Sequence, residues 1–389
     1  MLNKTISSVS PSVTLSLNAK ARELKMQGQD VIDLTIGEPD WPSAESVKEG
    51  GITAIRNNFT RYTDVPGILD LRAAVAHYYR YNHDVPSSSE NVLISNGGKQ
   101  ILAMLFAILL EKNDEVIIPT PYWTSYPEQV KLAGGVPVFV DTDDTFIIRA
   151  SAIHSLVGDR TRIIIINSPS NPTGAIVPKD ELEKILHCAQ EKNLLIISDE
   201  VYSELYYREK PCSIASLEQK PFTNVIIAAS LSKMSSMTGW RIGFALASYE
   251  IIGALNTYQS HFSSAPNAPA QRAAVAAFSA DSLEYTARMR EDLRMRRELL
   301  IESFQDIRGI SLYPPMGAFY GWLRTGDEIL KNTGDNFCAK LLDETLVAVV
   351  PGNAFGKEYS HMFRITFAVS RELLKAAAYR IREFAQKNR

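Results

Sequence analysis

One short stretch combines a lysine, two hydroxyls, a turn glycine and an arginine. Lys233 follows Ser230 and Ser232 and precedes Gly239 and Arg241, directly after an apolar, strand-like run. Hydroxyl and guanidinium donors suit the oxygens of a phosphate. A lysine beside an arginine is expected to have a lowered pKa, which makes its amine nucleophilic. The stretch therefore predicts an anion site next to a reactive amine.

The glycine pair before Lys99 is a second candidate for binding an anion. Gly98 and Lys99 follow a strand-like run and open a helical pattern, so backbone N–H groups would point at whatever lies before the helix. A lysine in the first turn opposes the helix dipole at a cost of about 0.3–1 kcal/mol. Lys99 is thus easier to understand beside a phosphate or carboxylate, although an ordinary strand–turn–helix corner explains the glycines equally well.

A turn-rich loop and an acidic strand end supply further polar residues. Asn171 follows the isoleucine run 163–166, and Asp199 and Tyr202 follow the next apolar run. Taken alone, the first is a loop and the acidic pair is a helix N-cap with an acidic first turn. Because ligands of open α/β sheets bind at the carboxyl ends of the strands, these side chains are expected to face the same edge as Lys233.

Short apolar runs alternate with helical patterns between about residues 45 and 280. Continuous apolar strands are typical of sheets buried on both faces, so the alternation predicts a mostly parallel α/β sheet. Strands are expected at 92–95, 115–119, 136–140, 162–166, 194–198, 225–228 and 242–247, and helices at 16–29, 44–58, 69–83, 99–111, 125–132 and 178–192.

The last third of the chain has a different character. Two long helical patterns, at 283–306 and 371–387, flank strand-like pieces at 317–323, 346–350 and 363–367. This arrangement predicts a smaller α+β domain. We therefore expect a segment 1–44 that joins the small domain, a large α/β domain at 45–284 and the small domain at 285–389.

Composition narrows the class of protein. The 389 residues carry a net charge of −3, with 45% hydrophobic and 22% charged residues, which does not favour a nucleic-acid partner. Three separated cysteines and six scattered histidines indicate neither a disulfide framework nor a metal site. The polar N-terminus lacks a signal sequence and no run is long enough to span a membrane, so a cytoplasmic enzyme is expected.

Six motifs together resemble the class I aminotransferases that depend on pyridoxal 5'-phosphate. They read GEPD at 37–40, GGKQ at 97–100, PYWTSYP at 121–127, NPTG at 171–174, DEVY at 199–202 and MTGWRIG at 237–243. The resemblance runs from about residue 12 to 370 and is closest to the bacterial aspartate aminotransferase branch. It implies the fold of that family, a mostly parallel sheet with helices on both faces plus a smaller α+β domain.

The resemblance also implies roles for individual residues. Lys233 would hold the cofactor covalently and then move a proton between the substrate Cα and the cofactor. Asp199 would pair with the pyridine nitrogen and keep it protonated. Tyr202 and Asn171 would bond the 3'-oxygen of the ring, and Trp123 would stack on the ring face. By the same resemblance, the catalytic residues are Lys233, Asp199 and Tyr202.

A phosphate site and a dimer follow from the same resemblance. The cofactor phosphate would be held by Gly98, Lys99, Ser230, Ser232 and Arg241. A tyrosine matching Tyr62 reaches the phosphate of the neighbouring subunit in this family, which implies a homodimer with shared active sites.

Substrate recognition is expected on both sides of the cofactor. Arg364 matches the clamp for the substrate α-carboxylate, which a planar guanidinium can bind at two points, and Gly37 would offer its backbone there beside Trp123 and Asn171. The branch binds the distal carboxylate with residues matching Lys99, Ser12 and Thr14; helix capping or plain surface explains the last two about equally well. The segment 259–267 is about two residues longer than usual and is expected to border this side-chain pocket.

The expected reaction moves an amino group between L-aspartate and 2-oxoglutarate, giving oxaloacetate and L-glutamate by a ping-pong route. Alternatives on the same fold are an aromatic or prephenate aminotransferase and a pyridoxal-dependent lyase. A non-catalytic amino-acid sensor is disfavoured, because the motifs begin near residue 1 and leave no room for a DNA-binding domain. A nicotinamide enzyme is disfavoured because no GxGxxG follows a strand.

Overall fold

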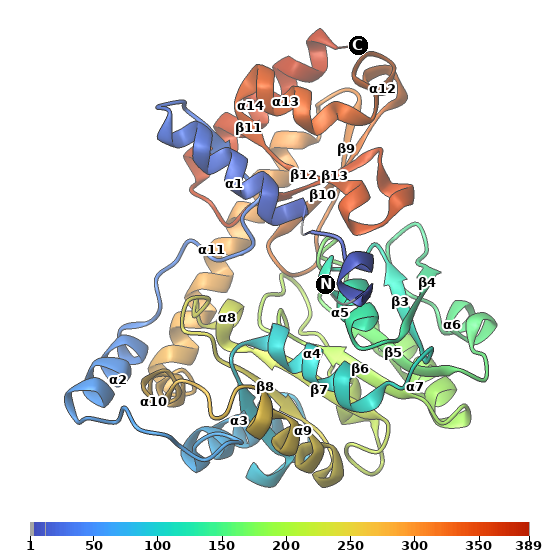
Figure 1. Ribbon diagram of the computed structural model, residues 1–389. Coiled ribbons are helices and arrows are strands. Elements are labelled where there is room, and N and C mark those ends of the chain that lie inside the picture. The colour runs from blue at the N-terminus through green and yellow to red at the C-terminus, as the bar shows by residue number, and fades with distance from the viewer. Residues whose placement is uncertain (1–3, 12, 389) are drawn as a thin grey trace.

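The structure is a computed structural model that describes residues 4–11 and 13–388. Within these residues the larger sheet has seven strands in the order β2-β8-β7-β6-β5-β3-β4 (Figure 1). The strands are β2 (Val92–Ser95), β3 (Glu115–Thr120), β4 (Val136–Asp141), β5 (Thr161–Asn167), β6 (Leu195–Asp199), β7 (Val225–Ser230) and β8 (Gly243–Leu246). β8 is antiparallel to both of its neighbours and the other pairs are parallel. The predicted, mostly parallel α/β sheet is confirmed.

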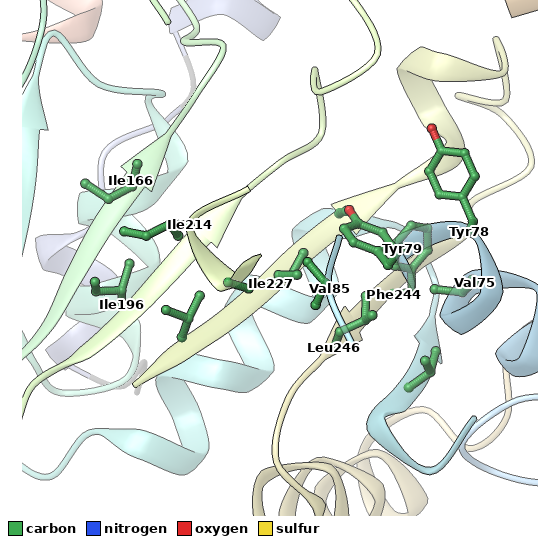
Figure 2. Packing of buried hydrophobic residues seen from close by; sticks show 14 of the residues in the cluster. Val75, Tyr78, Tyr79, Val85, Ile166, Ile196, Ile214, Ile227, Phe244 and Leu246 are labelled. Carbon is green, nitrogen blue, oxygen red and sulfur yellow. The ribbon is translucent and has the colours of Figure 1, made fainter. Parts of the chain in front are cut away.

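Both faces of the larger sheet are buried, as its continuous apolar strands predict. Along β5, Ile163 and Ile165 join one hydrophobic cluster, whereas Ile164 and Ile166 join another on the opposite face. Helices α4 (Gly98–Leu109), α5 (Ser125–Leu132) and α9 (Tyr249–Phe262) supply the first cluster. Helices α3 (Leu69–Asn82), α6 (Ala150–Leu156), α7 (Lys179–Glu191) and α10 (Ala268–Ala276) supply the second, part of which is drawn in Figure 2. The layered burial fixes where each strand ends.

The smaller sheet is antiparallel and has four strands within the described residues, in the order β12-β13-β10-β9. They are β9 (Ile310–Tyr313), β10 (Tyr320–Thr325), β12 (Val350–Pro351) and β13 (Met362–Thr366). Leu300 of α11 (Ala280–Phe304) and Ile381 of α14 (Arg371–Lys387) lie in one hydrophobic cluster with Phe363 and Ile365 of β13. A separate parallel pair joins β1 (Ile32–Asp33) to β11 (Val347–Ala348).

The remaining helices are α1 (Val13–Met26), α2 (Glu45–Arg56), α8 (Leu231–Met234), α12 (Asp327–Thr333) and α13 (Phe337–Thr345).

Several boundaries differ from those expected. The long helix α11 begins at 280, before the expected boundary at 284/285, because Ser279 caps it by accepting a hydrogen bond from the Ser282 N–H. The expected strand 346–350 is divided between β11 and β12, which belong to different sheets. Leu346, the residue just before β11, has a left-handed φ of 59°.

Helix α11 runs between the two sheets and the N-terminal segment passes beside it (Figure 1). Arg296 of α11 donates to both carboxylate oxygens of Asp40 at 2.7 and 2.8 Å, and Trp41 donates to Asp292 of the same helix at 3.1 Å. These bonds hold the segment that follows Gly37 against α11. No helix in the described ranges is apolar over a length that would cross a membrane.

Candidate active site

A pocket of about 420 Å³ lies at the carboxyl ends of β5, β6 and β7 and extends to the smaller sheet. It gathers most of the residues expected from the sequence. Those in its wall are Gly37, Gly98, Lys99, Trp123, Asn171, Asp199, Tyr202, Ser230, Ser232, Lys233, Arg241 and Arg364. Residues separated by more than 300 positions in the chain thus meet in one cavity, as the rule for strand ends in α/β sheets predicts.

Tyr62 and the segment 259–267 are not in this wall. Tyr62 is 94% exposed and lies outside the pocket of its own chain. Ser12 lies outside the described residues, and Thr14 belongs to α1, whose side chains are described from residue 17 onward. The segment 259–267 contributes no lining residue to the pocket of its own chain, so the expectation that it borders the side-chain pocket stays a prediction. It forms the end of α9 and the turn into α10, where Ser263 accepts a hydrogen bond from Gln100 at 2.7 Å.

Lys233 extends into the pocket from the short helix that follows β7. Ser230 caps this helix by accepting a hydrogen bond from the Ser232 N–H at 3.3 Å, so the chain turns sharply at the strand end. The amine of Lys233 donates to the backbone carbonyl of Gly37. Burial lowers the pKa of Lys233 to about 8; the charge of Glu38 opposes this shift, and repulsion from Arg241 adds to it. The lowered pKa agrees with the sequence prediction, but burial outweighs the neighbouring arginine as its cause.

The loop before α4 and the loop after α8 are in close contact. Gly97 has a φ of 90°, and a Cβ there would collide with the guanidinium of Arg241. Arg241 itself has a φ of 58° and donates to the Thr238 carbonyl at 2.9 Å and the Asn96 carbonyl at 3.4 Å. Ser230 lies beside Gly98, the first residue of α4. A helix N-terminus, two hydroxyls and a guanidinium therefore surround one end of the pocket, which suits an anion.

Asp199 ends β6 with its carboxylate buried in the pocket wall. The hydroxyl of Tyr126 donates to its Oδ2 at 2.6 Å and the Val201 N–H donates to its Oδ1 at 3.2 Å. Burial raises the pKa of Asp199 to about 6, although both hydrogen bonds act in the opposite direction. Among the described residues no cation is bonded to this carboxylate, which would gain from a positively charged partner inside the pocket.

Arg364 approaches from the middle of β13 and is 3% exposed. Its guanidinium donates to the Asn171 side chain at 2.8 Å and to the Thr35 carbonyl at 3.0 Å. Its Nε has no hydrogen-bond partner among the described residues. A buried cation with unused donors lowers its free energy by binding an anion, so this end of the pocket suits a carboxylate.

Lys99 is the second residue of α4 and also lines the pocket. Its amine is 5.0 Å from the ring centroid of Trp123, and burial, followed by repulsion from Arg241, lowers its pKa. The wall as a whole holds four cationic side chains, Lys99, Lys233, Arg241 and Arg364, against one carboxylate, Asp199. The pocket is therefore built for a ligand set with several negative charges.

Sequence reasoning assigned no role to several residues in the wall. Tyr126 bonds Asp199 and its ring meets that of Trp123 edge-on at 5.2 Å. It lies inside the motif at 121–127, three residues after Trp123, whose carbonyl accepts the Tyr126 N–H at 3.0 Å, so the motif itself was the available signal. Tyr320, Thr35 and Phe355 have no such motif, and only the fold brings them to Arg364.

Comparisons with known proteins now decide the family. The sequence model described as aminotransferase class I and II matches residues 29–381. The chain belongs to this family of aminotransferases. It is 38% identical to an aspartate aminotransferase of Bacillus subtilis over 394 residues, covering 100% of this chain and 99% of the relative. A Thermus thermophilus aspartate aminotransferase solved with maleate has a TM-score of 0.93 and 35% identity, and one from Rhizobium meliloti has 0.94 and 33%. Both alignments cover 99% of each chain. This aminotransferase thus places its pocket in the fold that those enzymes share.

Proposed function

We propose that this aminotransferase binds pyridoxal 5'-phosphate and transfers the amino group of L-aspartate to 2-oxoglutarate, giving oxaloacetate and L-glutamate by a ping-pong route. The observation that carries the proposal is the charge pattern of the pocket. A reactive amine and a buried carboxylate share one pocket with an anion site at Arg241 and a second one at Arg364. A phosphate at one end and a dicarboxylic amino acid at the other complement these charges.

The residues present fit this cofactor. Ser230, Ser232, Arg241 and the N-terminus of α4 provide donors for the phosphate oxygens. Asp199, whose carboxylate lacks a bonded cation, would pair with the protonated pyridine nitrogen. Lys233, with a pKa lowered to about 8, would reach the aldehyde carbon. Tyr202 and Asn171 would bond the 3'-oxygen, and Trp123 would cover the ring.

The reaction assigns a separate task to each of these side chains. Bound pyridoxal 5'-phosphate supplies an electron sink for the negative charge that develops at the substrate Cα. Lys233 would take the Cα proton as a general base and deliver it, as a general acid, to the cofactor carbon that carried the aldehyde. Asp199 stabilises the positive charge that draws those electrons, and Tyr126 keeps its carboxylate oriented. Burial of these groups excludes water and strengthens each electrostatic contact.

Two cations would select an acidic substrate. Arg364 would bind the α-carboxylate with its unused N–H donors, in the orientation set by Asn171 and Thr35. Lys99 would bind the distal carboxylate, with Ser12 and Thr14 as further candidates. The names of the Bacillus subtilis and Thermus relatives and the dicarboxylate maleate in the Thermus structure support this choice.

A wider substrate range is the second candidate. A Petunia hybrida relative, 36% identical over 98% of this chain, is named a bifunctional aspartate aminotransferase and glutamate/aspartate-prephenate aminotransferase. Prephenate also carries two carboxylates, so the same two cations could hold it.

We also infer a homodimer in which Tyr62, almost fully exposed in one chain, reaches the phosphate of the other subunit.

The half-reaction with single amino acids tests the proposal. Mixing the holoenzyme with L-aspartate or L-glutamate should convert the absorbance of bound pyridoxal phosphate to that of the pyridoxamine form, while L-alanine and L-phenylalanine should react far more slowly. Prephenate as acceptor then separates the two candidate ranges. No absorbance change with either acidic amino acid, or release of pyruvate or ammonia without an acceptor, would overturn the assignment.

A further inference from the structure

Tyr320 lies where the two sheets meet at the pocket. It is the first residue of β10, is 1% exposed and pairs with Thr366 of β13, two residues beyond Arg364. Residues i and j ± 2 on neighbouring antiparallel strands share a face of the sheet. The Tyr320 ring and the Arg364 side chain are therefore directed to the same side.

The ring of Tyr320 supports the guanidinium of Arg364. The guanidinium carbon lies 4.2 Å from the ring centroid, which is within the range of a cation–π contact. The ring of Phe355 lies 5.1 Å from the same carbon. The two terminal nitrogens of the guanidinium bond Asn171 and Thr35 along its edge. The ring of Tyr320 lies against its face, so both sets of contacts hold its plane in place.

The hydroxyl of Tyr320 reaches the other side of the pocket. It lies 2.9 Å from the hydroxyl of Tyr202, which follows β6 of the larger sheet. A Cβ added to Gly37 would lie 3.1 Å from the same hydroxyl, closer than an ordinary contact. Gly37 is the residue whose carbonyl accepts the Lys233 amine. The same hydroxyl thus contacts the expected partner of the cofactor 3'-oxygen and lies close to the residue that anchors the lysine.

We propose that Tyr320 is a positioning residue that couples substrate-carboxylate binding at Arg364 to the hydroxyl of Tyr202. The proposal rests on the proposed function, which assigns the carboxylate to Arg364 and the 3'-oxygen to Tyr202. A phenol has one proton. When Tyr202 donates it to the 3'-oxygen, Tyr320 must be the donor in the bond between the two hydroxyls, and such a chain makes Tyr202 a stronger donor.

Two substitutions separate the contributions of the ring and the hydroxyl. Tyr320→Phe keeps the ring under Arg364 and removes the bond to Tyr202, whereas Tyr320→Leu removes both. Tyr207→Phe is the matched control, because Tyr207 is also buried and its hydroxyl donates to the Ala318 carbonyl outside the pocket. Thermal unfolding of all three variants reports the purely structural cost of each change.

The first readout is the pH at which the absorbance of bound cofactor changes, measured in the holoenzyme without substrate. In Tyr320→Phe a weaker donor leaves the 3'-oxygen more basic, so the midpoint should rise by about half a pH unit or more. The control Tyr207→Phe should keep the wild-type midpoint. Equal midpoints in wild type, Tyr320→Phe and Tyr207→Phe would overturn the proposal, whatever the melting temperatures show.

The second readout is binding of succinate, a dicarboxylate without an amino group. Tyr320→Phe should bind it within about twofold of wild type, and Tyr320→Leu about tenfold more weakly, because only the latter loses the cation–π support. The change in absorbance midpoint that succinate causes should be smaller in Tyr320→Phe than in wild type, since binding and protonation are reciprocally linked. An undiminished change contradicts the coupling. If wild type itself failed to react with L-aspartate, the proposed function would fall instead.

Discussion

The larger sheet delivers its pocket residues from the loops that follow parallel strands, whereas the smaller sheet delivers them from within antiparallel strands. Asp199 and Lys233 lie at the ends of β6 and β7, where backbone N–H groups and helix N-termini are free to face a ligand. Arg364 and Tyr320 instead project from the hydrogen-bonded ladder of β13 and β10. The first kind of position provides reactive groups, and the second provides a rigid support for recognition.

Burial affects the charges of the residues from the two sheets differently. Lys233 and Asp199 have pKa values moved toward neutrality, to about 8 and about 6, because burial disfavours their charges. With such a pKa, Lys233 can take and give a proton near pH 7, while Asp199 can pair with a cation in the pocket. Burial also lowers the pKa of Arg364, but a guanidinium stays charged. The larger sheet therefore supplies proton transfer and the smaller sheet supplies a permanent charge.

Replacing Lys233 should have the largest effect on the side of the larger sheet. Lys233→Ala should keep the cofactor through the phosphate and ring contacts but lose about 10⁴-fold or more in turnover, because both the covalent link and the proton carrier are removed. Stopped-flow absorbance with L-aspartate measures the rate, and the spectrum after gel filtration measures retained cofactor. Near-normal turnover in this variant would refute the central role of the lysine.

Replacing Arg364 tests the division from the side of the smaller sheet. Arg364→Lys keeps the charge but loses the planar fork and the bonds to Asn171 and Thr35, so kcat/KM for L-aspartate should fall about 10- to 100-fold, mainly through a higher KM. Arg324→Lys on the neighbouring strand β10, at an exposed position, is the control and should be silent. A loss confined to kcat would mean that Arg364 acts in the chemical step, like Lys233, and not in binding the substrate.

The sequence predicted the two sides of the pocket unequally for a physical reason. Strand ends of a parallel sheet follow apolar runs, so the positions of Asp199, Asn171 and Lys233 could be found from hydrophobic pattern and turn residues. Arg364 came from the family resemblance, because an arginine inside a strand has no local signal of burial. Tyr320 was missed altogether, since its partners are 118 positions before it and on a neighbouring strand.

The position of the longer segment 259–267 in the fold could not be predicted from the local sequence. Its insertion was visible in the sequence, but its place was not, because the α9–α10 turn is set by packing on the larger sheet. There Gln259, fully buried, donates to the Val65 carbonyl at 2.7 Å and the Ile94 carbonyl at 2.9 Å. These contacts anchor one end of the segment on the sheet, outside the pocket wall of its own chain.

The smallest expected effect is a change in stability that follows the charge of Asp199. Its pKa in the folded protein is raised to about 6 from an ordinary 3.8. The folded state therefore binds a proton before the unfolded state does. The resulting loss of stability is fully present above pH 6 and is relieved as the pH falls toward 3.8. In the cofactor-free protein, Asp199→Asn should raise the free energy of unfolding at pH 8 by on the order of 1–3 kcal/mol, with little gain near pH 4.

Asp143 provides a control of opposite sign for that experiment. Burial would raise the pKa of Asp143, but hydrogen bonds, the strongest from the Thr145 side chain, lower it to about 2, so its charge stabilises the folded state above the ordinary pKa of 3.8. Asp143→Asn should therefore lose stability at pH 8. Urea unfolding of both cofactor-free variants at pH 4 and pH 8 gives the comparison. If Asp199→Asn were less stable than wild type at pH 8, the carboxylate would already be compensated within the chain, and its need for a cationic partner in the pocket would be refuted.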